Sequence, residues 1–280
     1  MPDQPPLQES GPPATLDSCA DAVRGYYDEF MTSRMVRYRL YGNRRLDAAG
    51  ARILPFLTPR ARILDVGCGI GIIAERVGRR VSRGFVLGID ISPRNIWYAK
   101  QTVKRPNVAF ETVDLRIDPH RVPQLLGGLA DVVLLIDVIE HIPASERQSL
   151  LGTLRSLSAE RSTLVVTYPS PQFHEYLSSH DPAELQVIDN VIDLATLIQE
   201  AAGAGFHLIQ YSLEAVWMAN QYCHAIFQTD VSISPPVMTN GQGWIHKAIA
   251  RALCRGASRV LASARRRKYV TRVFSSRSEN

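Results

Sequence analysis

The alternation of short apolar runs with amphipathic segments constrains the fold of this chain most. Runs rich in Val, Ile and Leu are typical of buried strands, and the segments between them have helical spacing. The strand-like runs lie at residues 61–67, 84–92, 107–115, 130–139 and 162–170, and the helix-like segments at residues 70–81, 93–105, 144–158 and 193–206. Residues 207–217 and 222–230 resemble a closing antiparallel pair. We therefore expect an α/β fold with a doubly wound, mostly parallel seven-stranded sheet.

Three segments lie outside this alternation. Residues 1–18 are polar and rich in Pro, without the layout of a signal peptide, so we expect a disordered leader. Residues 19–59 have helical spacing on both sides of a break at Gly42-Asn43, which predicts two helices. Residues 236–280 form a separate C-terminal extension in which positive charge predominates.

Composition places the chain among ordinary globular proteins of a reducing compartment. Its apolar share of 45% is sufficient for a substantial core. No apolar run approaches the ~20 residues that a membrane span needs. The four cysteines form no C-x-x-C pair and fit no zinc spacing, as expected of free thiols. We expect a cytoplasmic protein.

The turn after the first strand, in the stretch ILDVGCGIG, carries Gly67, Gly69 and Gly71. Glycines between a strand and a helix let a ligand approach the backbone and the helix N-terminus. Dinucleotide folds use such a turn for pyrophosphate. Asp65 stands two residues before the first glycine, where its negative charge would repel an anion. A ligand with a cationic group, such as S-adenosylmethionine, suits this turn better than NAD.

This stretch resembles motif I of the class I S-adenosylmethionine-dependent methyltransferases, in which an acid precedes GxGxG. The resemblance extends over roughly residues 60–227, and it implies a methyltransferase domain at residues 60–235 with residues 19–59 as a helical lid. The cofactor-binding residues that it implies are Asp65, Gly67, Gly69, Gly71, Asp90, Ile91, Asp114, Leu115 and Asp137.

Three further acids follow successive strands at the edge of the sheet where such folds bind ligands. Asp90 closes the second strand, and a carboxylate there accepts hydrogen bonds from a ribose diol. The resemblance implies that Asp114 contacts the adenine amine, that Leu115 offers its backbone N–H, and that Asp137 lies near the methionine part of the cofactor. For any single acid, the alternative is that it merely caps a loop.

The residues after the fourth strand also limit the methyl acceptor. Nucleic-acid amine methyltransferases of this fold show (N/D/S)PP(Y/F) there, whereas this chain has Asp137-Val138-Ile139-Glu140. No Pro-Cys dipeptide of the cytosine-C5 enzymes occurs. The stretch DVIEHIP is similar to methyltransferases of small molecules, including quinone precursors, sugars and other secondary metabolites. We expect oxygen as the methylated atom more than nitrogen or carbon.

Transfer to oxygen needs an aligned acceptor and a base for its proton. Histidine suits this role at neutral pH, and His141, directly after the fourth strand, is the first candidate. His174, in the long segment after the fifth strand, is the second, and His180 and His224 are weaker ones. Each of them has a plain alternative as a loop or packing residue. No clustered ligand set indicates a catalytic metal, so none is expected.

The C-terminal extension has one apolar face, which includes Trp244 and Ile249, and one basic face, which includes Lys247 and Arg251. This pattern predicts an amphipathic helix that could dock on an anionic membrane surface. A helix packed on the domain is the alternative, and nucleic acid is not an expected partner.

Two other functions remain open at this point. One is an RNA methyltransferase that uses the basic extension as its anchor. The other is a non-catalytic protein that binds the cofactor or works only as an interaction partner. This alternative stays open because the acids at the strand ends indicate that the cofactor can bind, but not that a methyl group is transferred.

Overall fold

The computed structural model describes residues 36–182 and 189–231. The chain divides into one unit up to Val231 and a second from Ser232 to Asn280. The expected leader, the first part of the predicted lid and the basic C-terminal helix lie outside the described residues. Their predicted boundaries, and the docking of the basic helix, stay predictions.

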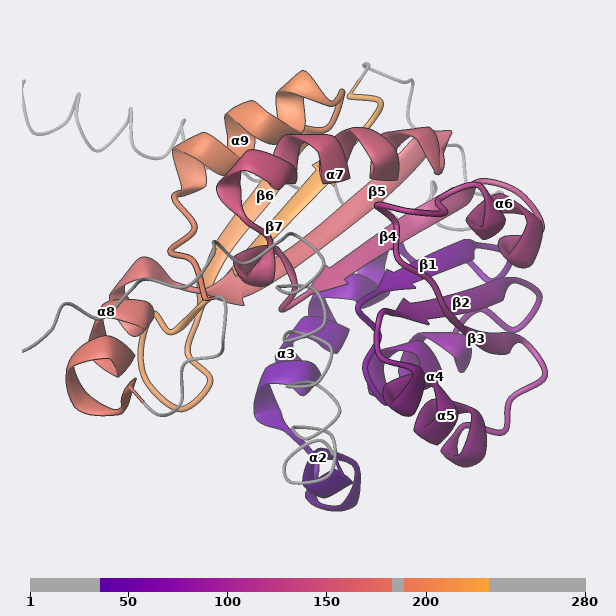
Figure 1. Ribbon diagram of the computed structural model, residues 1–280, viewed down its shortest axis with the longest axis horizontal. Coiled ribbons are helices and arrows are strands. Elements are labelled where there is room, and N and C mark those ends of the chain that lie inside the picture. Colours follow the sequence, from indigo (N-terminus) through magenta and orange to yellow (C-terminus); the bar gives the residue numbers. More distant parts are fainter. Residues whose placement is uncertain (1–35, 183–188, 232–280) are drawn as a thin grey trace, which may run out of the picture. The chain divides into compact units, whose positions relative to one another are not determined.

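Seven strands form one sheet in the order β3-β2-β1-β4-β5-β7-β6 (Figure 1). The strands are β1 (Arg62–Val66), β2 (Phe85–Asp90), β3 (Val108–Thr112), β4 (Ala130–Ile136), β5 (Ser158–Pro169), β6 (His207–Glu214) and β7 (Tyr222–Gln228). The first five run parallel, and β7 lies antiparallel between β5 and β6. This arrangement confirms the expected doubly wound, mostly parallel sheet and its closing antiparallel pair.

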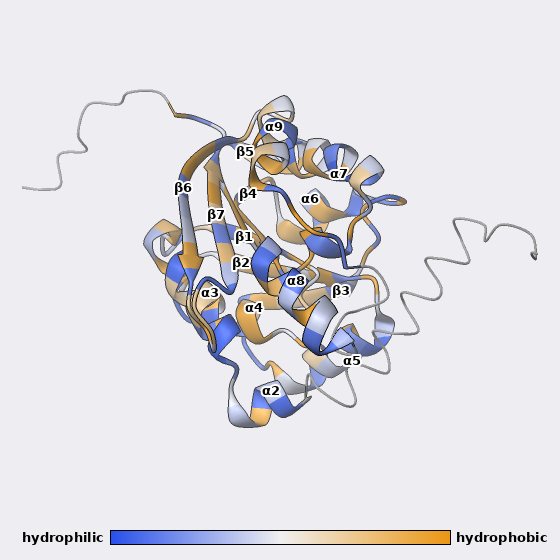
Figure 2. Cartoon of the chain, turned by 90° about the vertical axis from the view of Figure 1, so that its left-hand side faces the viewer, coloured by the Kyte–Doolittle hydropathy of each residue, from blue (hydrophilic) through white to orange (hydrophobic). Residues whose placement is uncertain are grey.

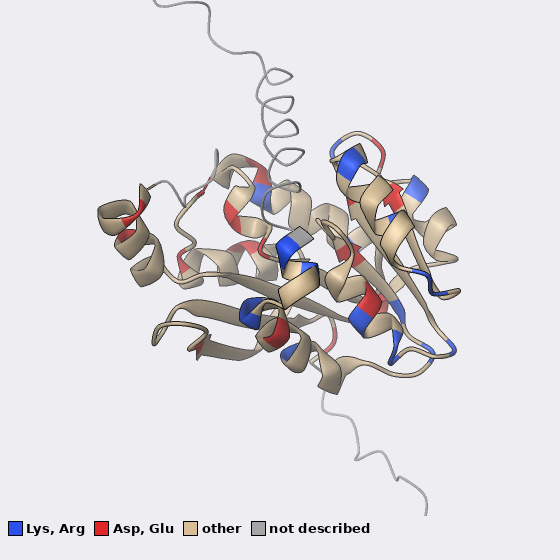
Figure 3. Cartoon of the chain, turned by 90° about the horizontal axis from the view of Figure 1, so that it is seen from below, with Lys and Arg blue, Asp and Glu red and all other residues tan. Residues whose placement is uncertain are grey.

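Helices cover both faces of the sheet. They are α2 (Val36–Tyr41), α3 (Arg44–Ile53), α4 (Ile72–Gly78), α5 (Pro93–Thr102), α6 (Arg121–Leu126), α7 (Ala144–Ser156), α8 (Pro171–His180) and α9 (Leu194–Gly203). Apolar residues of α3, α4 and α5 join one buried cluster, and those of α6, α7 and α9 join the other. Hydrophobic residues follow the strands in Figure 2, and the charged residues in Figure 3 lie mostly on helices and loops. Two apolar layers therefore hold the sheet.

The break predicted at Gly42-Asn43 separates α2 from α3. Gly42 has a positive φ of 78°, which a residue without Cβ adopts at little cost. The Asn43 side chain accepts hydrogen bonds from the backbone N–H groups of Arg45 and Leu46, and thereby caps α3. A glycine and a capping residue in sequence are enough to fix this boundary.

The segment after β5 differs from the prediction. We expected a long loop around His174, but residues 171–180 form α8. Ser170 caps this helix by accepting a hydrogen bond from Phe173 N–H, and Pro171 occupies its first position. Ser170 followed by Pro171 is a local sequence signal for the start of a helix, and the prediction of a loop did not take it into account. Among the described residues, no helix is both long and apolar enough to cross a membrane.

Candidate active site

The three glycines of the β1–α4 turn all adopt left-handed backbone conformations. Their φ values are +67° at Gly67, +52° at Gly69 and +76° at Gly71. A Cβ at Gly67 would lie 2.5 Å from Val138, and a Cβ at Gly71 would lie 2.5 Å from Phe110. Both conformation and space therefore require glycine, and the turn leaves bare backbone at the carboxyl edge of the sheet.

Asp65, near the end of β1, is 2% exposed. Burial, together with the neighbouring Asp90 carboxylate, raises its pKa to about 7, although a backbone hydrogen bond from Ala74 opposes this change. Its Oδ2 atom is buried and has no hydrogen-bond partner. A buried acceptor without a donor costs free energy, so Asp65 is suited to a ligand that brings a donor or a positive charge.

Asp90, the last residue of β2, joins three segments of the site. Its Oδ2 accepts from Gly69 N–H at 2.9 Å, and its Oδ1 accepts from Ser92 N–H at 2.8 Å and from the Asn95 side chain at 3.3 Å. These bonds hold the glycine turn against the start of α5. Ile91 follows directly and is partly buried. The carboxylate is thus fixed in orientation at the strand end, as a diol-binding acid requires.

Asp114 and Leu115 follow β3. The Asp114 carboxylate accepts two hydrogen bonds from the Arg116 side chain, at 3.0 Å and 2.7 Å. Leu115 is buried in the core. The structure therefore places both residues beside the strand end, but the charge of Asp114 is balanced by a neighbour that the sequence argument did not consider.

Asp137, directly after β4, has a φ of +56°, which is unusual for a residue other than glycine. Its carboxylate accepts from the Thr167 hydroxyl at 2.8 Å and forms an ion pair with Arg45 Nε at 2.8 Å. Arg45 also donates to the Tyr222 hydroxyl at 3.0 Å and lies over its ring. Strained backbone and the contacts with Thr167 and Arg45 fix Asp137 where β4, β5, β7 and α3 meet.

Arg45 is a residue of the site that the sequence did not predict. It stands in the first turn of α3, where a positive charge opposes the helix dipole. This unfavourable position is the signal in the sequence that could have identified Arg45, because a cation at a helix N-terminus needs a compensating negative partner. The compensation comes from Asp137, 92 positions along the chain.

Glu140 and His141 belong to a short 3-10 helix after β4, Ile139–His141. Glu140 is 2% exposed, and its Oε2 has no hydrogen-bond partner. Burial first and the Asp137 carboxylate second raise its pKa. His141 Nε2 lies 3.8 Å from Glu140 Oε1. The first candidate base is therefore next to a buried carboxyl group that the sequence argument did not select.

The other histidines occupy different surroundings. His174, on α8, has its Nε2 within 2.8 Å of the Asp189 carbonyl oxygen. The His180 ring stacks on Tyr176. His224, on β7, is 1% exposed, neither ring nitrogen has a hydrogen-bond partner, and burial lowers its pKa. His174 thus holds the main-chain segment at Asp189, which comes directly before Asn190.

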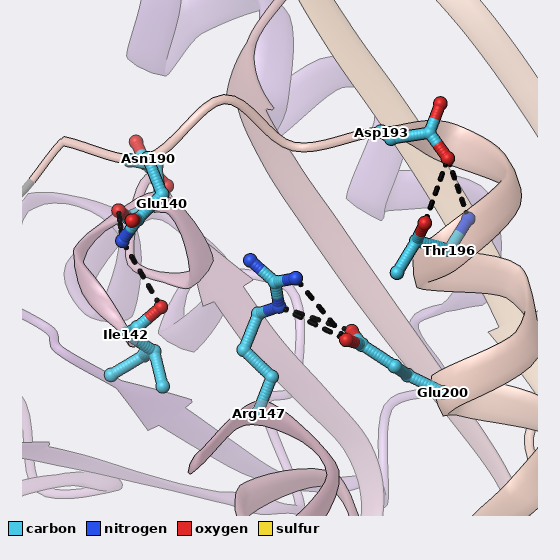
Figure 4. A network of polar contacts seen from close by, with 7 residues as sticks. All are labelled: Glu140, Ile142, Arg147, Asn190, Asp193, Thr196 and Glu200. Atoms are coloured by element: carbon cyan, nitrogen blue, oxygen red, sulfur yellow. Dashed lines mark hydrogen bonds and ion pairs between the residues drawn. The ribbon is translucent and has the colours of Figure 1, made fainter. Parts of the chain in front are cut away.

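A polar network fixes the segment that carries His141 (Figure 4). The Asn190 side chain donates to the carbonyl oxygens of Glu140 at 2.9 Å and Ile142 at 3.2 Å. The backbone N–H of Asn190 also donates to Glu140 at 2.8 Å. Nearby, Arg147 on α7 pairs with Glu200 on α9. The segment before α9 therefore positions the residues after β4.

Comparison with known proteins is consistent with this geometry. Curated ubiquinone biosynthesis O-methyltransferases are similar over a short region: that of Cereibacter sphaeroides is 36% identical over 81 residues, and that of Neisseria meningitidis is 38% identical over 85 residues. Each match covers 29% of this chain, and 31% and 34% of those proteins. The chain thus spans about a third of the length of these relatives.

Solved structures share the fold over much more of the chain. Magnesium protoporphyrin IX methyltransferase from Synechocystis, solved with bound SAH, superimposes with a TM-score of 0.59 at 19% identity, covering 75% of this chain and 99% of that one. A methyltransferase from Anabaena variabilis gives 0.57 at 15% identity, covering 75% and 94%. A family model described as a methyltransferase domain matches residues 37–211, more than half of the sequence. The chain therefore belongs to the methyltransferase-domain family, in its class I, Rossmann-like form.

Proposed function

We propose that this protein transfers a methyl group from S-adenosylmethionine to a small-molecule acceptor, with oxygen as the methylated atom. The observation that carries the proposal is the set of four carboxylates around the glycine turn. Asp65 and Asp90 lie at the ends of β1 and β2, and Asp114 and Asp137 follow β3 and β4 at the same edge of the sheet. The matched relatives are named O-methyltransferases, which supports an oxygen acceptor, but the matched regions cover only part of this chain.

The residues at this edge fit the cofactor. S-adenosylmethionine supplies a methyl group on a sulfonium centre, which is already a good leaving group. Gly67, Gly69 and Gly71 carry no side chains that could block the approach of the cofactor to the backbone. The buried Oδ2 of Asp65 lacks the donor that an α-amino group provides. Asp90 would hold the ribose diol, and Asp114 with Leu115 the adenine.

The protein must also align the acceptor and remove its proton. His141 remains our first candidate for the base, with Glu140 beside it, and His174 the second. We further propose residues 19–59 as a lid, residues 60–235 as the catalytic domain, and the extension at residues 236–280 as a peripheral anchor on an anionic membrane surface in the cytoplasm.

The test is calorimetry with S-adenosylhomocysteine on wild type, Asp90→Ala and Asp131→Ala. Asp131 is a matched control, because its carboxylate accepts a hydrogen bond from Arg62 N–H at the opposite end of the sheet. We expect binding to wild type and to Asp131→Ala. Loss of the Asp90 bonds should weaken binding at least tenfold, that is, by about 1.4 kcal/mol or more. Absence of binding to wild type at millimolar ligand would refute the proposal.

If binding is found, metabolite extracts are incubated with enzyme and labelled methyl donor, and the labelled product is identified by mass spectrometry. A labelled methyl ether or ester supports transfer to oxygen. Label on nitrogen, on carbon or only on RNA would replace the proposed acceptor class.

A further inference from the structure

A groove of about 580 Å³ lies between the α2–α3 turn and the turn that joins β6 to β7. Its volume falls in the range of small-molecule sites. The residues that matter for its chemistry are Arg37, Tyr38, Tyr41, Arg44, Asp47 and Trp217. Residues 37–47 of the groove belong to the proposed lid, and none of the other roles assigned above uses this groove.

Both walls of the groove are held by buried polar side chains. On one side, Asn43 caps α3 through the N–H groups of Arg45 and Leu46. On the other side, the Gln221 side chain, only 2% exposed, accepts from the N–H groups of Trp217 at 2.9 Å and Met218 at 3.1 Å. The Trp217 turn is thus preformed, which reduces the entropy cost of binding.

The helices beside the groove also contact the cofactor edge of the sheet. Arg39 on α2 donates to the Ile70 carbonyl oxygen, inside the glycine turn, at 2.6 Å, and pairs with Glu75 on α4. Arg45, next to groove residue Arg44, pairs with Asp137. A ligand in the groove therefore lies against the same two helical segments that contact Ile70 and Asp137.

The chemistry of the groove is aromatic and cationic. Tyr41 is 82% exposed and Trp217 is 55% exposed, so both present ring surface to a ligand. Among the described residues, Arg37 and Arg44 have no hydrogen-bond or ion-pair partner, whereas the one acid, Asp47, pairs with Arg76 at 2.5 Å. Aromatic faces stack on planar rings, and free guanidinium groups bind carboxylates.

We infer that this groove binds the methyl acceptor, and that the acceptor is a planar aromatic compound with an acidic group. The ring packs on Trp217 and the tyrosines, and the acid pairs with Arg37 and Arg44. This inference rests on the proposed function, since it names the substrate class of the same enzyme.

The test uses two acids of different size, 3,4-dihydroxybenzoate and 1-hydroxy-2-naphthoate, and their neutral counterparts, catechol and 1-naphthol. Binding to the full chain is measured by calorimetry with and without saturating S-adenosylhomocysteine. We expect at least one acid to bind about tenfold more tightly than its neutral counterpart, because a carboxylate gains charge-assisted hydrogen bonds.

Matched variants locate the site. Arg37→Gln/Arg44→Gln should remove the preference for the acid, and Trp217→Ala should weaken acid and neutral compound alike. The controls are Arg60→Gln and Trp97→Ala, since Arg60 is exposed and Trp97, on α5, is 61% exposed. Both controls should bind like wild type.

The outcomes separate the two proposals. If S-adenosylhomocysteine binds but neither acid is preferred, or if the groove variants behave like the controls, the groove inference is wrong. If the acids bind in the groove but S-adenosylhomocysteine does not, the proposed function fails. A third outcome is that the protein sediments with phosphatidylglycerol vesicles, loses this binding in Trp217→Ala, and binds neither acid more tightly than its neutral counterpart. The groove would then be a lipid-binding surface, and its assignment to the methyl acceptor would be wrong.

Discussion

The Asp65 carboxylate illustrates how one residue gives the site its charge preference. It is buried, close to Asp90, and has one oxygen without a partner. These conditions raise the cost of its negative charge when no ligand is present. A ligand with a cationic group would relieve this cost, which supports the proposed role of Asp65 in binding S-adenosylmethionine.

The raised pKa of Asp65 predicts a pH dependence of stability. Between its ordinary value of 3.8 and its value of about 7 in the fold, the folded protein holds a proton that the unfolded chain has released. The free energy of unfolding should therefore fall as the pH rises across this range. Asp65→Asn removes the titration, so it should be more stable relative to wild type at pH 8 than at pH 5.

Urea midpoints at both pH values measure this effect. Asp131→Asn, which changes a partly buried carboxylate at the opposite end of the sheet, serves as the control and should show no such difference. An equal effect of Asp65→Asn at the two pH values would mean that Asp65 titrates normally in the folded protein.

His141 makes a second prediction at the residue scale. His141→Ala should reduce turnover of the acceptor found by the labelled-methyl screen by about 100-fold, the usual lower range for loss of a general base. Affinity for S-adenosylhomocysteine should change little. His180→Ala is the control, because that ring stacks on Tyr176 on α8. Wild-type turnover in His141→Ala would leave His141 with a structural role only.

At the scale of elements, the site depends on segments held to each other by polar contacts. The short helix after β4 carries Glu140 and His141, and its position depends on Asn190 from the segment before α9. Similarly, Arg45 ties α3 to Asp137. Such contacts orient the segment that carries the proposed base, although Asn190 and Arg45 have no proposed role in the chemistry itself.

Asn190→Ala tests this coupling directly. Loss of the side-chain bonds to Glu140 and Ile142 should accelerate hydrogen–deuterium exchange of residues 138–142. Asp193→Ala is the matched control, because it removes the N-cap of α9 three residues later and leaves those carbonyl oxygens bonded. Equal exchange in the two variants would show that Asn190 does not hold this segment.

At the scale of the whole molecule, two apolar layers stabilise the sheet, and one buried ion pair joins the helices α7 and α9. Arg147 and Glu200 have side chains that are 8% and 15% exposed. Removal of one partner leaves the other charge buried and uncompensated. A buried ion pair often adds little to the free energy of unfolding by itself. Removal of only one of its two charges is nevertheless strongly destabilising.

Arg147→Met should lower the free energy of unfolding by about 3 kcal/mol. Arg161→Met is the control: Arg161 pairs with Asp230 but is 75% exposed, so the loss should stay below about 1 kcal/mol. The double variant Arg147→Met/Glu200→Met should recover most of the loss. Denaturant unfolding measures all three, and a similar loss for both single variants would contradict the argument.

The sequence alone determined the sheet, the glycine turn and the helix boundary at Gly42-Asn43. These features depend on local physics, namely side-chain periodicity, left-handed glycines and capping within a few residues. The same locality explains why the carboxylates at the strand ends were predicted, because parallel strands bring their carboxyl ends to one edge of the sheet.

Only the tertiary structure decided which distant residues complete the site. Arg45 contacts Asp137 across 92 positions of sequence, and Asn190 contacts Glu140 across 50 positions. Trp217 lines the same groove as the α2–α3 turn, more than 170 positions away. No periodic pattern links such pairs, because their contact depends on how the helices pack on the sheet and not on the conformation of either segment.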